Sequence, residues 1–381
     1  MQKARTSIIL IGIILFTFIC AFVGDGEEVY TLEQLREIYS SGKPDTWPKP
    51  DLDEEPAKSF RDIGKLDTMR FPESNKYSKE KALLGKTLFY DPRLSVSKQI
   101  ACASCHDPEL AWGDGKRVAF GHNRQTGKRN SMTMINVGYY QSLFWDGRAK
   151  TLEEQVHFPV EDPAEMANDL KSMVRNVKKI KGYRDFFKSA FGTSEVSLQR
   201  IQYAIATFER TITSRNTRFD RFVSGNSKAM NDEEVRGLHL FRTKARCINC
   251  HNTPLFSDDK FHNDGQALFG LKGQDLGRYA ITGDKKDIGA FKTPSLRETK
   301  ITGPWMHHGN FASLRDVIQF YNGGNPSRIP KSVVVDEAMR PVTSPILRKL
   351  KLTKEENQQL EAFLGAISTT SQKLSPPKLP D

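Results

Sequence analysis

Apolar residues recur at helical spacing in the middle of the chain and again near its end. The first stretch places Ile201, Ile205, Phe208 and Ile212 on one face, and the second does so with Leu360, Phe363, Leu364 and Ile367. This period predicts helices that bury one face in a core. No region shows sustained strict alternation of apolar and polar residues. We therefore predict an all-α fold with long functional loops.

A short pattern occurs twice along the chain and predicts a duplicated helical unit. Gly-Lys-Thr-Leu-Phe at 85–89 and Gly-Leu-His-Leu-Phe at 237–241 each precede a pair of cysteines. Asn231 and Glu234 have the spacing of a capping box, which opens the second of these helices. Residues 91–93 mark an inserted loop in the first copy. Such an internal repeat is typical of duplication.

The first 24 residues have the composition of a secretory targeting segment. Lys3 and Arg5 form a positive region, and residues 7–24 are then almost wholly apolar. This order predicts export to the periplasm. The apolar stretch is long and lacks an A-x-A cleavage site, so an uncleaved N-terminal membrane anchor is the alternative interpretation. Cys20 follows Ile19, which is a poor match to a lipidation site.

The composition changes after this segment. Residues 25–75 are rich in proline and acidic residues, which predicts an extended arm with at most a short helix at 32–39. We expect two domains, at 76–225 and 226–370, followed by a tail at 371–381. The formal net charge is +11, but the basic residues are scattered and not interleaved with aromatic ones. We therefore expect no nucleic-acid partner.

Four of the five cysteines lie in two C-x-x-C-H motifs, Cys102-Ala-Ser-Cys105-His106 and Cys247-Ile-Asn-Cys250-His251. This motif attaches haem c through two thioethers, and its histidine supplies an imidazole to the iron. A zinc site would need four ligands in a compact cluster, and neither motif has a second pair nearby. A redox-active cysteine pair is the other alternative. We predict two haem c groups, with His106 and His251 as axial ligands.

From Gly85 to the final helix, the chain resembles the bacterial dihaem cytochrome c peroxidase and MauG family. Besides the two haem motifs, the resemblance is carried by Gly121-His122, residues 127–131, Phe-Trp-Asp-Gly-Arg-Ala at 144–149, Asp-Pro-Ala-Glu-Met at 162–166, Phe-Lys-Thr-Pro-Ser-Leu-Arg at 291–297 and Pro-Trp-Met-His-His-Gly at 304–309. It implies two cytochrome c-like domains, each enclosing one haem. The first haem would be the peroxide site and the second the electron-transfer site.

The resemblance also implies roles for three residues near the first haem. Glu165 matches the distal acid/base carboxylate, although by itself it reads as an exposed residue of an acidic loop. Trp145 matches the tryptophan between the haems, a position that a core tryptophan would also occupy. His122 matches the distal histidine that caps the first haem at rest, and its alternative is a surface loop histidine.

At the second haem, the resemblance implies a different distal ligand from that of the electron-accepting peroxidases. Those enzymes have a methionine where this chain has Tyr321, as MauG-like proteins do; Met306 is the alternative ligand. Asn130, Thr302 and Pro304 match a calcium site between the domains. Nothing in the residues themselves would have selected these three.

The predicted function is a periplasmic dihaem peroxidase that reduces hydrogen peroxide to water. Electrons would come from a small redox protein, either a cytochrome c or a cupredoxin. One alternative is a MauG-like enzyme that oxidises a protein residue through high-valent haem. The other is a dihaem electron carrier without catalysis, which would not need Glu165. The sequence leaves open whether the chain forms a homodimer.

Overall fold

The computed structural model describes residues 30–214, 216–324, 339–370 and 374–381, and the single residues 329, 333 and 336. The predicted targeting segment at 1–24 and Cys20 lie outside these residues. Residues Leu32–Asp381 form one compact unit. No helix in the described ranges has the length and apolar character needed to cross a membrane.

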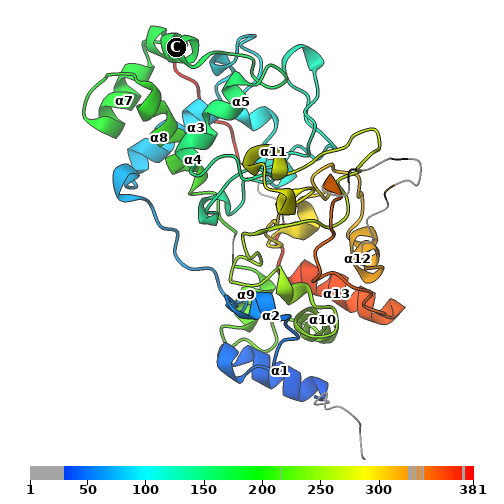
Figure 1. Cartoon of the computed structure of the whole chain (residues 1–381). Helices are drawn as coiled ribbons and strands as arrows, with labels where there is room; N and C mark the ends of the chain where they lie inside the picture. The colour runs from blue at the N-terminus through cyan, green and yellow to red at the C-terminus, as the bar shows by residue number, and fades with distance from the viewer. Residues whose placement is uncertain are drawn as a thin grey trace, which may run out of the picture. The chain divides into compact units, whose positions relative to one another are not determined.

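The described chain is rich in helix and has little sheet (Figure 1). Its α-helices are α1 (Leu32–Ser40), α2 (Glu54–Ala57), α3 (Lys79–Phe89), α4 (Leu152–Gln155), α5 (His157–Glu161), α6 (Leu170–Lys179), α7 (Tyr183–Phe191), α8 (Leu198–Glu209), α9 (Arg218–Phe222), α10 (Asp232–Arg242), α11 (Tyr279–Thr282), α12 (Leu314–Asn322) and α13 (Lys354–Ala366). Strands β1 (Phe261–His262) and β2 (Phe291–Lys292) pair antiparallel. The helix-rich part of the fold prediction is confirmed.

In the first half, residues 76–225, the helix that precedes the haem motif packs on α8. Gly85 of α3 lies at the crossing, where an added Cβ would come 1.8 Å from the carbonyl oxygen of Ala204. Phe89 and Phe208 meet edge to face, with ring centroids 5.4 Å apart. The glycine is therefore needed for the close approach of the two helices.

The second half, residues 226–370, repeats this arrangement with α10 and α13. An added Cβ on Gly237 would come 2.0 Å from the carbonyl oxygen of Gln359. Phe241 and Phe363 again meet edge to face, at 5.3 Å. Capping boxes open both helices, at Asn231 with Glu234 and at Thr353 with Glu356, as we predicted for α10. The repeated sequence pattern thus corresponds to a repeated helix pair.

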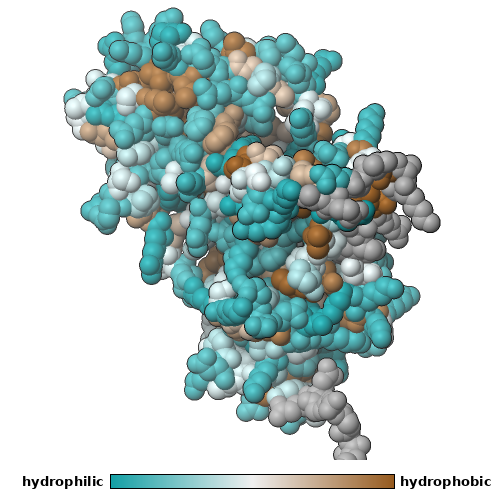
Figure 2. Space-filling model, viewed as in Figure 1, coloured by the Kyte–Doolittle hydropathy of each residue, from teal (hydrophilic) through white to brown (hydrophobic). Residues whose placement is uncertain are grey.

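The apolar face predicted in the middle of the chain belongs to α8. Ile201, Ile205 and Phe208 are buried there, and Ile212 is buried just beyond the end of the helix. The face of the molecule in Figure 2 is mainly hydrophilic, with smaller apolar patches between the polar groups. The helices thus turn their apolar sides inward.

The described part of the proline-rich arm runs along the second half before it reaches α3. Helix α1 packs on α10. Further along, the Asp51 amide donates to the carbonyl oxygen of Arg242 at 2.9 Å. The Asn249 side chain donates to the carbonyl oxygen of Asp51 at 2.8 Å and accepts from the Asp53 amide at 2.8 Å. Because Asn249 lies inside the second haem motif, the arm covers that attachment segment.

Candidate functional site

The two C-x-x-C-H segments adopt the same backbone turn. Each begins with a short 3-10 helix, Cys102–Ser104 in the first motif and Cys247–Asn249 in the second. The amide of the histidine then donates to the carbonyl oxygen of the first cysteine, at 3.0 Å for His106 and 2.8 Å for His251. All four cysteines are free of disulfide bonds. Their thiols are therefore available for thioether attachment.

Both imidazoles are oriented by a backbone carbonyl. Nδ1 of His106 lies 3.1 Å from the carbonyl oxygen of Trp112, and Nδ1 of His251 lies 3.0 Å from that of Phe256. A carbonyl only accepts, so Nδ1 carries the hydrogen and Nε2 keeps its lone pair. Burial also lowers the pKa of both imidazoles, which keeps them neutral. This arrangement fits two proximal haem ligands.

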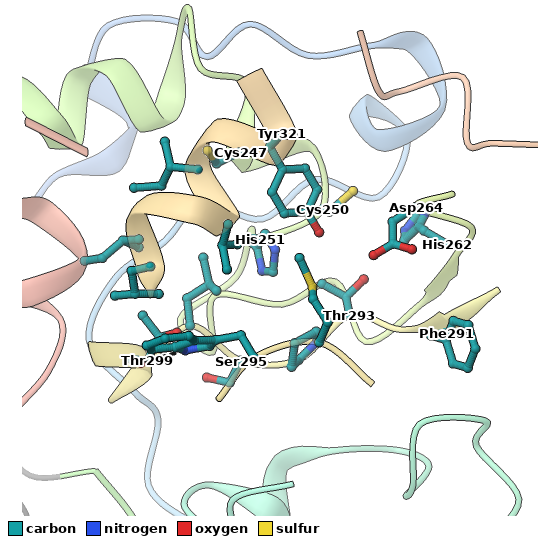
Figure 3. A pocket seen from close by; sticks show the side chains of 18 of the residues that line it. Cys247, Cys250, His251, His262, Asp264, Phe291, Thr293, Ser295, Thr299 and Tyr321 are labelled. Atoms are coloured by element: carbon teal, nitrogen blue, oxygen red, sulfur yellow. Dashed lines mark hydrogen bonds between the residues drawn. The ribbon is translucent and has the colours of Figure 1, made fainter. Parts of the chain in front are cut away.

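The second motif lines a mainly apolar cavity (Figure 3). Cys247, Cys250 and His251 line one part of it, and the phenol of Tyr321 projects into the same space. The donor set and the apolar wall fit a haem held by two thioethers and an imidazole.

Both candidate distal ligands of the second haem reach this cavity. Tyr321 lies near the end of α12, a helix capped by Ser313, and Met306 comes from the loop before it. Burial raises the pKa of the Tyr321 phenol well above its ordinary value, and the charge of Asp264 raises it further. The geometry is compatible with Tyr321 as the predicted distal ligand, and it does not exclude Met306, the alternative ligand.

Trp145 connects the two halves. It comes from a loop of the first half, is 9% exposed, and lines the same cavity as the second haem motif. Its indole nitrogen donates to the carbonyl oxygen of Asn130 at 2.9 Å, and its own carbonyl accepts from the Lys292 amide at 2.8 Å. Its ring meets that of His307 edge to face at 6.4 Å. An aromatic side chain therefore lies beside the second cavity, held by both halves.

The loops that carry Glu165 and His122 touch each other. The His122 amide donates to the carbonyl oxygen of Glu165 at 2.8 Å. Gly121 permits this approach, because an added Cβ would come 2.0 Å from the carbonyl oxygen of Ala164. Nδ1 of His122 is buried and has no hydrogen-bond partner among the described residues. The structure thus brings together two residues that lie 43 positions apart.

Glu165 also lies within electrostatic range of the first haem motif. Burial and, next, the charge of Glu165 raise the pKa of the Cys105 thiol to about 11. The pKa of Glu165 itself is raised, first by burial and then by Asp162, while Arg148 opposes the shift. Burial in a partly dry site favours the protonated form of a carboxyl over its charged form. It is therefore not the exposed loop residue of the alternative reading.

The three predicted calcium ligands line one cavity. Asn130, Thr302 and Pro304 belong to the wall that also contains Trp145. The Asn130 side chain donates to the carbonyl oxygen of Lys116 at 2.9 Å, so its own side-chain oxygen is turned the other way. These neutral oxygens suit a hard cation, but none of the three residues supplies a carboxylate. The cation stays a prediction.

Sequence reasoning missed the charged residues of this cavity. Asp264 and Lys292 are among those that line it. Asp264 belongs to Asn-Asp-Gly, which reads as an ordinary turn, and Lys292 belongs to a motif that was used only as a marker of resemblance. No sequence signal distinguishes either residue from a surface charge.

Comparison with known proteins agrees with this geometry. The family of di-haem cytochrome c peroxidases matches residues 79–228. The methylamine utilization protein MauG of Methylophilus methylotrophus is 38% identical over 319 residues, which cover 83% of this chain and 90% of that protein. This chain belongs to the di-haem cytochrome c peroxidase family. Its members are haem-dependent oxidoreductases, so the predictions of family and of enzyme are confirmed, and membership implies two haem c groups.

Other similar proteins are named either as peroxidases or as MauG-like proteins. The cytochrome-c peroxidase IdrP1 of Pseudomonas sp. (strain SCT) is 35% identical over 348 residues, covering 84% of this chain and 89% of that protein. A solved MauG-like protein associated with microbial copper homeostasis has a TM-score of 0.71 and 31% identity, covering 80% of this chain and 93% of that one. The dihaem peroxidase BthA of Burkholderia thailandensis has a TM-score of 0.64 and 25% identity, covering 83% and 94%. Peroxidase activity and MauG activity both occur within the family.

Proposed function

We propose that this chain is a periplasmic dihaem c-type peroxidase that reduces hydrogen peroxide to water with electrons from a cytochrome c or a cupredoxin. The observation that carries this proposal is Glu165, a carboxyl with a raised pKa in electrostatic range of the first haem motif. An electron carrier needs no such acid. Export rests on the predicted targeting segment at 1–24.

Two residues at the first haem motif have separate roles in the proposed reaction. Reduction of H₂O₂ takes two electrons and two protons and yields two molecules of water. When bound, haem supplies the redox chemistry of that reduction. Glu165 accepts a proton from one peroxide oxygen and returns it to the oxygen that leaves. A carboxyl with a raised pKa can act in this way as both general base and general acid. His106 would bind the first haem, and its ring is oriented by the hydrogen bond to the carbonyl of Trp112.

His122 is proposed to cap the first haem at rest. Its unpaired Nδ1 and its backbone bond to Glu165 support a loop that can exchange positions at this site. Asn123 and Arg124, which follow it, have positive φ angles of 51° and 58°. Such angles are uncommon for residues other than glycine, so the backbone of this loop is in a conformation of raised free energy.

Trp145 is proposed to lie on the electron path between the halves. His251 and Tyr321 would hold the second haem, which would supply the redox group where electrons enter. The contacts of Trp145 with Asn130 and Lys292 hold its ring at the boundary of the halves. A calcium ion bound by the oxygens of Asn130, Thr302 and Pro304 would stiffen the same boundary.

The decisive experiment is stopped-flow addition of hydrogen peroxide to the purified protein, with and without a reduced cytochrome c. We expect peroxide-dependent oxidation of the cytochrome, and a loss of about 10²-fold or more in Glu165→Gln, the scale of acid–base catalysis. Glu161→Gln is the matched control, because that exposed carboxyl lies four residues away. Equal turnover in the wild type and Glu165→Gln would rule out the proposed role.

One observation favours a MauG-like activity as a second candidate. Tyr321 reaches the second cavity, and a hard phenol oxygen favours higher oxidation states of iron over the soft sulfur of methionine. Relatives named MauG are also among the most similar proteins. This activity would appear as peroxide consumption without a reduced cytochrome, coupled to covalent oxidation of a protein substrate that mass spectrometry detects.

A further inference from the structure

Asp264 presents a fixed carboxylate to the second cavity. It follows β1 in the turn Asn263-Asp264-Gly265 and lines the cavity near Tyr321 and Cys250 (Figure 3). Gln266 holds both oxygens, with its amide donating to Oδ1 at 3.1 Å and its Nε2 to Oδ2 at 2.7 Å. The carboxylate is therefore oriented by neutral donors.

The charge of Asp264 is only partly offset. Nearby His262 lowers the pKa of Asp264, but His262 is itself paired with Asp258. The lysine and arginine side chains that line the cavity are paired with other carboxylates: Arg246 with Asp51 and Asp53, Lys292 with Asp259, and Arg348 with Asp53. Asp264 has no ion pair among the described residues, and the second haem would lie in the cavity it lines.

We propose that Asp264 lowers the reduction potential of the second haem, because its carboxylate lines the haem cavity without an ion pair. Ferric haem carries one more positive charge than ferrous haem. A nearby anion in a weakly polar site therefore favours the ferric form. Burial raises the pKa of the Tyr321 phenol most, and the charge of Asp264 raises it next. The charge of Asp264 therefore acts on a group at the proposed haem site. Its buried position gives Asp264 a pKa of about 6, so it is mainly ionised at pH 8.

This inference rests on the second haem of the proposed function, and it deepens the role assigned to that site. Tyr321 as an anionic ligand would act in the same direction as Asp264. The two together make the second haem a weak acceptor of electrons. A donor that reduces it therefore needs a low potential of its own.

The test is a potentiometric titration of the purified dihaem protein at pH 8, following the absorption bands of the second haem. Asp264→Asn keeps the shape and removes the charge, and the Gln266 amide can turn to present its oxygen to the new NH₂ group. We expect a tenfold or larger shift of the Fe(III)/Fe(II) equilibrium toward Fe(II), which is a rise of about 59 mV or more for one electron. Asp284→Asn, an exposed carboxylate of the same half, is the control and leaves the potential unchanged.

A shift smaller than twofold in Asp264→Asn would overturn the inference. If that variant does not accumulate with two haems, Asp264→Ser makes the same change of charge with a smaller side chain and decides the question. Tyr321→Phe is measured in parallel. If it leaves the spectrum of the second haem unchanged, tyrosine ligation fails, while the result for Asp264 stands by itself.

Discussion

Glu209 should make this protein less stable as the pH rises. Its side chain lies in α8, is 2% exposed, and has one carboxylate oxygen without a hydrogen-bond partner among the described residues. Burial raises its pKa from 4.5 to about 8, with Arg210 opposing and Glu153 adding to the shift. The folded protein therefore keeps a proton on Glu209 between these two values, while the unfolded chain has already lost it.

The sign and size of the effect follow from linkage. Because the folded state binds more protons across this interval, the free energy of unfolding falls as the pH rises from about 4.5 to 8. Each pKa unit corresponds to about 1.4 kcal/mol, so the whole penalty is roughly 3–6 kcal/mol. Below pH 4.5 the carboxyl is neutral in both states, and the penalty vanishes.

Glu209→Gln removes this penalty, since glutamine has the shape of the protonated acid and no charge. We expect the variant to match the wild type at pH 4.5 and to be more stable by several kcal/mol at pH 8.5. Guanidinium unfolding followed by circular dichroism at both pH values measures the difference. Glu161→Gln, on an exposed side chain, should follow the wild type throughout. Parallel pH profiles for the wild type and Glu209→Gln would refute the reasoning.

Three further predictions concern packing and the haem ligands. Gly237→Ala should lower the free energy of unfolding by about 1–3 kcal/mol through overpacking against Gln359, whereas Gly365→Ala on the partner helix meets only ordinary contacts and should be neutral or stabilising by up to about 1 kcal/mol. Denaturant midpoints of the two variants decide this. Tyr321→Met should raise the potential of the second haem and introduce the near-infrared band of methionine-ligated ferric haem; that band in the wild type would exclude tyrosine ligation. His122→Gly should react with peroxide at once in the oxidised state, while the wild type should need partial reduction first, as stopped-flow absorbance reports.

The sequence by itself determined those features that depend on neighbours in the chain. The C-x-x-C-H turns, the capping box at Asn231 and the buried face of α8 follow from local hydrogen bonds and from helical periodicity, which act over a few residues. The repeat around Gly85 and Gly237 was visible for the same reason. Its cause, two helix crossings that leave no room for a Cβ, was not, because the opposing carbonyls lie more than one hundred residues away.

Only the tertiary structure decided which charges are compensated and which groups share a pocket. Asp264 and Glu209 look like ordinary acidic residues in the sequence. The fold removes both from water and pairs neither with a cation in the described chain, so their pKa values rise. Asn130 likewise lines one cavity with Thr302 and Pro304 only because the halves pack together. Desolvation and pairing depend on the sum of long-range contacts, and the order of residues along a chain does not encode that sum in any local pattern.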